Sequence, residues 1–180
     1  MDISCTEPVA TFTDTDATGH VTMTLPTGFT GYFEVHSAEM DTLLYVTQPI
    51  VKNTLNRDLP VLTPDTLDIT TSTLGAPYDT ARGIVLIEAI DCSGTPQGGI
   101  HFATKDDGIA FYLVDQVPNK DQKVTVYDPT NNTADGGFIN VPLGFATFSA
   151  QVGVDSNGLQ LGKFNAQIRP NTITFIDMHF

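Results

Sequence analysis

The chain has 180 residues, of which 41% are hydrophobic, and its 8 basic and 21 acidic side chains give a net charge of −13. The apolar content is enough for a core and argues against wholesale disorder. The negative field repels phosphate backbones and anionic lipid, so we expect no nucleic-acid partner. No apolar run is long enough for direct membrane insertion.

The first residues, Met1-Asp2-Ile3-Ser4, lack the basic and apolar regions of a signal peptide. We therefore expect either a cytosolic protein or a fragment of a longer one. Thr is abundant, and 15 Gly and 11 Pro divide the chain into short alternating runs. Such runs between turn signals predict an all-β sandwich or barrel.

Three strands are predicted in the first third of the chain. Residues 21–25 alternate strictly between apolar and polar side chains, and the turn signal at 26–28 follows them. The second strand covers residues 31–36, and a third covers 43–46.

One segment has the punctuation of a short helix. Thr63 suits the N-cap, Pro64 the first helical position and Gly75 the residue just past the C-terminus. The apolar side chains of this helix, which need a partner surface, are Leu67, Ile69 and Leu74.

The second half of the chain carries more strand patterns. Residues 84–90 are nearly all apolar, which predicts a strand buried on both faces. A turn at 91–99 follows, and residues 100–103 and 110–114 flank a Lys-Asp-Asp-Gly turn in a hairpin pattern. Five further strands are predicted at residues 124–127, 138–141, 145–152, 159–168 and 172–180, and we expect the last to be paired inside a sheet.

One pattern occurs twice, in residues 13–35 and 132–152. Each copy runs from acidic or amide residues through Gly and an alternating run to Pro-x-Gly-Phe and a second alternating run. We expect Pro-x-Gly to reverse the chain so that the next strand pairs with the previous one. The aligned pairs are Pro26 with Pro142, Gly28 with Gly144, Phe29 with Phe145 and Tyr32 with Phe148.

These motifs resemble carboxypeptidase regulatory-like domains, which are small transthyretin-like or immunoglobulin-like β-sandwiches. The family's Thr-Asp-x-x-Gly, Pro-x-Gly and Tyr signature falls on Thr15, Asp16, Gly19, Pro26, Gly28 and Tyr32. In the second copy it falls on Asp135, Gly136, Pro142, Gly144 and Phe148, with Phe in place of Tyr. The family's opening turn is matched by Asp91, Gly94, Pro96 and Gly99.

The resemblance implies two β-sandwich modules in tandem. Residues 1–60 form an incomplete module that lacks the opening strand, 61–80 form a linker with the short helix, and 81–180 form a complete module. We expect the first module to dock on the second through the helix, and the aromatic at Tyr32 or Phe148 to fill space between sheets.

What the resemblance implies about function is a non-catalytic accessory or adhesion module of an exported bacterial protein. Such a module serves attachment, spacing or ligand contact on a protein or glycan surface, outside the cell or in its envelope. One alternative is a carbohydrate-binding module. Another is a β-sandwich metalloenzyme such as an intradiol dioxygenase, whose Tyr/His iron cluster no spacing here supplies. Oligomeric state is not indicated.

A weak calcium site is the one metal candidate. Asp14 and Asp16 resemble the start of a calcium loop, but no bidentate Glu follows, and a hairpin turn is the competing interpretation. We expect no other cofactor. The four histidines, which lack metal-binding spacing and are expected to face solvent from strands, are His20, His36, His101 and His179.

The cysteine count leaves one disulfide open. Two cysteines invite a bond, yet Cys5 and Cys92 occupy equivalent positions in different copies of the repeat. Equivalent positions in two modules need not meet, so the sequence does not decide the redox state.

Overall fold

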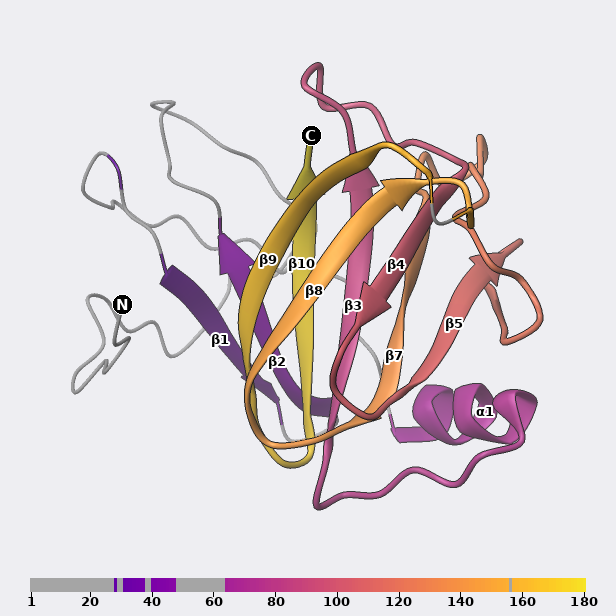
Figure 1. Cartoon of the computed structure of the whole chain (residues 1–180). Coiled ribbons are helices and arrows are strands. Elements are labelled where there is room, and N and C mark those ends of the chain that lie inside the picture. Colours follow the sequence, from indigo (N-terminus) through magenta and orange to yellow (C-terminus); the bar gives the residue numbers. More distant parts are fainter. Residues whose placement is uncertain (1–27, 29–30, 38–39, 48–63, 156) are drawn as a thin grey trace.

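The computed structural model describes residues 28, 31–37, 40–47, 64–155 and 157–180. Within them lie ten strands and one helix, which confirms the all-β class (Figure 1). In chain order the elements are β1 (Gly31–Ser37), β2 (Met40–Thr47), α1 (Pro64–Leu74), β3 (Gly83–Ile90), β4 (Ile100–Thr104), β5 (Ile109–Val114), β6 (Val117–Asn119), β7 (Asp135–Val141), β8 (Gly144–Val152), β9 (Gln160–Ile168) and β10 (Thr172–His179).

The strands form two sheets. The larger has seven strands in the order β1-β2-β10-β3-β7-β5-β6, and the smaller has three in the order β4-β8-β9. In Figure 1 the smaller sheet lies in front of the middle of the larger one. Strand β10 runs parallel to both of its neighbours, β2 and β3, which confirms that the last predicted strand is paired inside a sheet.

The core between the sheets is built from alternating residues of both. Phe148 is fully buried, and its ring lies 5.5 Å from that of Phe138 on the larger sheet. This confirms the predicted inward phase of Phe148. The other buried members are Val85, Ile87, Ala89, Ile100, Phe102, Tyr112, Val141, Ala146, Ala150, Ala166, Ile168, Ile176 and Met178.

A second core lies on the opposite face of the larger sheet, where α1 packs. Ile84 points into this core while Val85 points into the first, so β3 is buried on both faces as predicted. The buried members of the second core are Leu43, Leu67, Leu74, Ile84, Phe111, Ile139 and Ile173.

Helix α1 ends as the sequence predicts. Gly75 has a φ of +65°, and its amide donates to the Ser72 carbonyl while that of Ala76 donates to Thr71, which is the Schellman pattern. Leu67 and Leu74 are buried, but Ile69 is 65% exposed, so the prediction that Ile69 needs a partner surface is wrong. The buried stripe continues through Thr71 instead, because positions four and seven residues after Leu67 share its face.

Two predicted strand connections are wrong. β4 and β5 do not form a hairpin, because β4 pairs with β8 while β5 pairs with β6 and β7. The intervening turn carries the chain from the smaller sheet to the larger. The physical reason is the core: Phe102 and Tyr112 face each other from opposite sheets with stacked rings 5.9 Å apart.

The second Pro-x-Gly turn also crosses between sheets. β8 follows it in the smaller sheet and pairs with β4 and β9, not with the preceding β7. Asp135 and Gly136, which the motif assigns to a turn, lie inside β7. Residues 124–127 form no strand, although Thr125 exchanges backbone hydrogen bonds with Gly99 and Ile100.

The repeat partners Tyr32 and Phe148 have different surroundings. Tyr32 is half-buried below the Arg169 guanidinium, 5.2 Å from its ring centre, and its hydroxyl accepts a hydrogen bond from Arg169. Glu34 pairs with the same arginine at 3.1 Å. Tyr32 therefore ties β1 to the turn before β10, whereas Phe148 fills the space between sheets.

The described strands run continuously across the expected boundary between modules, since β2 pairs directly with β10. The division into residues 1–60, 61–80 and 81–180 stays a prediction. The predicted strand at 21–25, the cap Thr63 and the first-copy residues Thr15, Asp16, Gly19, Pro26 and Phe29 lie outside the described residues.

Candidate functional site

The outward face of the smaller sheet is the most distinctive surface of the described chain. Strands β4, β8 and β9 contain no Asp or Glu, although the chain has 21 such residues. Because Ala146, Phe148 and Ala150 point inward, the alternate residues of β8 point outward. The outward residues of β8 and their β9 partners are Phe145 with Gln167, Thr147 with Asn165, and Ser149 with Lys163.

Amides and hydroxyls on this face hold one another across the strands. The Thr147 hydroxyl donates to Asn165 Oδ1 at 2.7 Å, and the Gln160 amide donates to Gln151 Oε1 at 2.6 Å. Thr147 and Asn165 are both exposed, as is Phe145 at one end of the face, with 57% of its surface accessible. Neutral polar pairs therefore line the face, with Lys163 as its one fixed charge among β4, β8 and β9.

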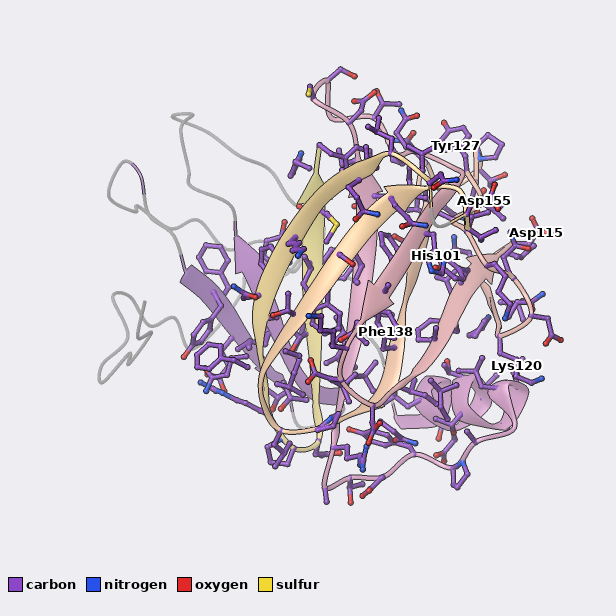
Figure 2. All side chains as sticks on the ribbon, in the orientation of Figure 1. His101, Asp115, Lys120, Tyr127, Phe138 and Asp155 are labelled. Atoms are coloured by element: carbon purple, nitrogen blue, oxygen red, sulfur yellow. The ribbon has the colours of Figure 1, made fainter. Side chains whose placement is uncertain are left out.

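His101 borders this face on β4 (Figure 2). It pairs with Gln151, and its Nδ1 lies 2.7 Å from the Lys123 carbonyl, so Nδ1 carries the proton and donates. This hydrogen bond holds the half-buried His101 against the loop that contains Lys123. The prediction that the His101 side chain faces solvent is therefore wrong. Tyr112 lies behind it, and burial raises the pKa of the Tyr112 hydroxyl to about 12.

The outward face of the larger sheet has the opposite character. Glu88 on β3 is the register partner of both Asp135 on β7 and Asp177 on β10. Alternation puts all three side chains on the face of the sheet that also carries α1. We call these three residues the carboxylate row. Like charges directly opposite on neighbouring strands are unfavourable, so this row raises the free energy of the charged folded state.

Burial sets the electrostatics of the carboxylate row. Asp177 is 4% exposed and accepts a hydrogen bond from the Tyr45 hydroxyl. The Oδ1 atom of Asp135 is buried without a hydrogen-bond partner. Burial, and then the charges of Asp177 and Asp128, raise the pKa of the Asp135 carboxyl to about 6. Asp135 therefore changes charge close to neutral pH.

Two other carboxylates organise loops. Asp91 Oδ1 accepts from the Ser93 hydroxyl and from the Thr95 amide, and these bonds lower the pKa of Asp91. Bonds from Asn131 and Gln116 lower the pKa of Asp128 to about 2. Both carboxylates stay charged in these turns.

The predicted calcium residues Asp14 and Asp16 lie outside the described residues, so the calcium site stays a prediction. Of the histidines, His20 also lies outside them, His179 is exposed, and His36 is placed in β1. Within the described ranges, no three His, Cys, Asp or Glu side chains are grouped to hold a metal ion, and this includes the carboxylate row. Cys92 is an exposed, unbridged thiol, while Cys5 lies outside the described residues.

Sequence reasoning missed the carboxylate row, although a signal for it exists. Glu88 and Asp177 are each the only acidic residue in a strand that reads as buried. A lone acid there predicts either a special partner or a shifted pKa. Asp135 gave no such signal, because the sequence places it in an Asp-Gly motif that is typical of a turn rather than of a buried strand.

No family model, curated protein or solved structure matches this chain.

Proposed function

We propose that the chain is a non-catalytic contact module of the carboxypeptidase regulatory-like type, two β-sandwich units in tandem, that attaches an exported bacterial protein to an outside surface. The observation that carries this proposal is the outward face of the smaller sheet. Its side chains are exposed or half-buried, its strands contain no carboxylate, and hydrogen-bonding side chains line it in an otherwise acidic protein. A face of this kind suits contact with a broad surface better than it suits chemistry on a small substrate.

Turn geometry supports the proposed family. Gly94 and Gly99 of the opening turn have φ values of +86° and +83°, and Asp91 accepts backbone hydrogen bonds there. These are the roles that the Asp-x-x-Gly-x-Pro-x-x-Gly pattern requires of its residues. Gly28 and Gly144 of the two Pro-x-Gly turns have φ values of +80° and +112°, which supports the tandem repeat.

An extracellular or cell-envelope location is part of the same proposal and rests on the resemblance. In the part of the chain that the structure describes, no helix has the length and apolar character to cross a membrane.

The proposal is tested by sedimenting the purified protein with isolated envelope material from the source cells. We expect the protein to pellet with this material and Asn165→Glu, which puts a carboxylate on the neutral face, to reduce binding. Ser72→Glu is the matched control, because Ser72 is exposed on α1, which packs on the face of the larger sheet opposite the smaller sheet. Absence of pelleting, or equal loss in both variants, would contradict the proposal.

A further inference from the structure

We infer that the outward face of β4, β8 and β9 binds a neutral polysaccharide lying along the strands. This inference rests on the proposed contact function and names its ligand. The term neutral face is used below for Phe145, Thr147, Ser149, Gln151, Lys163, Asn165 and Gln167 together with His101.

Hydrogen-bonding capacity is the first argument. A sugar hydroxyl both donates and accepts, and so it is best matched by groups that do the same. The Thr147 hydroxyl donates to Asn165 and the Ser149 hydroxyl to the Ala103 carbonyl, so both hydroxyls keep acceptor capacity for a ligand. The side-chain amides of Asn165 and Gln167 supply donors, whereas a carboxylate accepts only. Thr147 uses the Oδ1 acceptor of Asn165, and the exposed amide remains the donor side of that pair.

Charge is the second argument. A net charge of −13 repels acidic polysaccharides and other polyanions at long range. The neutral face carries no carboxylate of its own, so covering it with a neutral ligand leaves no unpaired anion beneath. Its one fixed charge is Lys163, whose exposed side chain can keep the ammonium group in water. Asp106 lies at the margin, where its Oδ2 accepts from the Thr147 amide at 3.4 Å and from the Thr104 hydroxyl at 3.3 Å.

Shape is the third argument. Cross-strand pairs repeat along β8 and β9 every second residue, which is about 6.7 Å. The outward pairs from Phe145 to Gln151 therefore extend over roughly 20 Å, and this matches an extended chain rather than a single sugar. Phe145 stands at one end with 57% of its surface exposed, where its ring is available to stack on the apolar face of a sugar.

The same composition argues against a protein partner. Stable protein interfaces have an apolar, aromatic-rich centre inside a polar rim. Here the apolar residue Phe145 lies at the end, and the centre is occupied by Thr147, Asn165 and Ser149. The neutral face thus has the reverse arrangement.

The experiment is affinity electrophoresis of the intact protein through gels containing amylose, a soluble β-glucan or dextran, with polygalacturonate as the acidic comparison. We expect retardation by at least one neutral polymer and none by polygalacturonate. Phe145→Ala should weaken the retarding interaction about tenfold, the scale of losing an aromatic anchor. Asn165→Glu should weaken it as well. Leu159→Ala is the matched control, because Leu159 is an exposed apolar residue that lies outside the neutral face.

Each outcome decides between the two proposals. Retardation lost in Phe145→Ala and kept in Leu159→Ala supports the inference. Envelope binding without retardation by any neutral polymer overturns the polysaccharide inference and leaves the contact function standing. Retardation that is unchanged in both Phe145→Ala and Asn165→Glu also overturns it, because the sugar would then bind elsewhere. Loss of envelope binding and of retardation overturns both. Unchanged thermal melting of the variants shows that folding is not the cause.

Discussion

The face of the larger sheet that carries α1 and the outward face of the smaller sheet differ in their content of acidic side chains. On the larger sheet Asp177 is buried and Glu88 and Asp135 are half-buried beside it, whereas the strands of the smaller sheet contain no carboxylate. The acidic residues behind the net charge of −13 are therefore unevenly distributed between the two faces. The net charge of a protein disfavours like-charged partners at long range, while the charges on one face determine which partner can bind there.

The largest expected effect tests the inward and outward phases of β8, on which the neutral face depends. Phe148→Ala should lower the free energy of unfolding by about 3–5 kcal/mol, because it opens a cavity between the sheets. The exposed neighbour Thr147→Ala should cost less than about 1 kcal/mol. Denaturant melts measure both. Equal losses would mean that the strand phase is wrong and the neutral face misassigned.

The next effect tests the carboxylate row through pH. The pKa of Asp135 is about 6 in the folded protein against an ordinary value of 3.8, so the folded state holds this proton more tightly than the unfolded state. Stability is then fully present below about pH 4 and falls as pH rises to about 6, by roughly 3 kcal/mol in total.

Asp135→Asn keeps the shape but removes this titration. We expect the variant to lose most of the fall in stability between pH 4 and pH 6 and to be more stable than the parent above pH 6. The exposed Asp107→Asn is the control and should leave the profile intact. If the stability of the parent protein does not fall across this range, charging Asp135 does not destabilise the folded state and the prediction is wrong.

A third effect compares glycines on the two sheets. A Cβ at Gly137 of β7 would overlap the Val85 carbonyl oxygen, whereas one at Gly162 of β9 meets nothing within 4 Å. Gly137→Ala should therefore cost about 1–3 kcal/mol. Gly162→Ala should change stability by less than about 1 kcal/mol, in the stabilising direction. Melts in which Gly162→Ala is the worse variant would contradict the placement of β9 as an open strand.

The smallest expected effect concerns calcium. If the turn interpretation of Asp14 and Asp16 is correct, millimolar calcium should shift the melting temperature by less than about 1 °C. A larger increase in the melting temperature would indicate that calcium binds to acidic residues of the folded protein. Its loss in an Asp14→Asn, Asp16→Asn double variant would assign it to the predicted loop, and its loss in Asp135→Asn to the carboxylate row.

Much of the local structure could be predicted because the signals are local. The start of the helix at Pro64, its end before Gly75 and the two-sided burial of β3 follow from single-residue chemistry and periodicity. Strand partners could not be predicted in the same way. Alternation at Phe102 and Tyr112 fits a hairpin and a crossing between sheets equally well, and only the assembled core distinguishes them.

The candidate site shows the same limit. The outward phase of Thr147 was readable from β8 alone, but its pairing with Asn165 needs the register of two strands. The carboxylate row needs three strands that come from distant parts of the chain. Each of its residues reads as an isolated acid until β10, β3 and β7 are set in order.

Strand order also sets the timing of assembly. β10 lies between β2 and β3, yet the ribosome delivers it after both. During synthesis β2 and β3 therefore emerge with unsatisfied edges and wait for the strand that joins them. Closing this gap requires β10 to pair with β2 across well over a hundred residues, so we expect closure of the sheet to be slow. Until β10 arrives, the larger sheet therefore consists of two separate parts, β1-β2 and β3-β7-β5-β6.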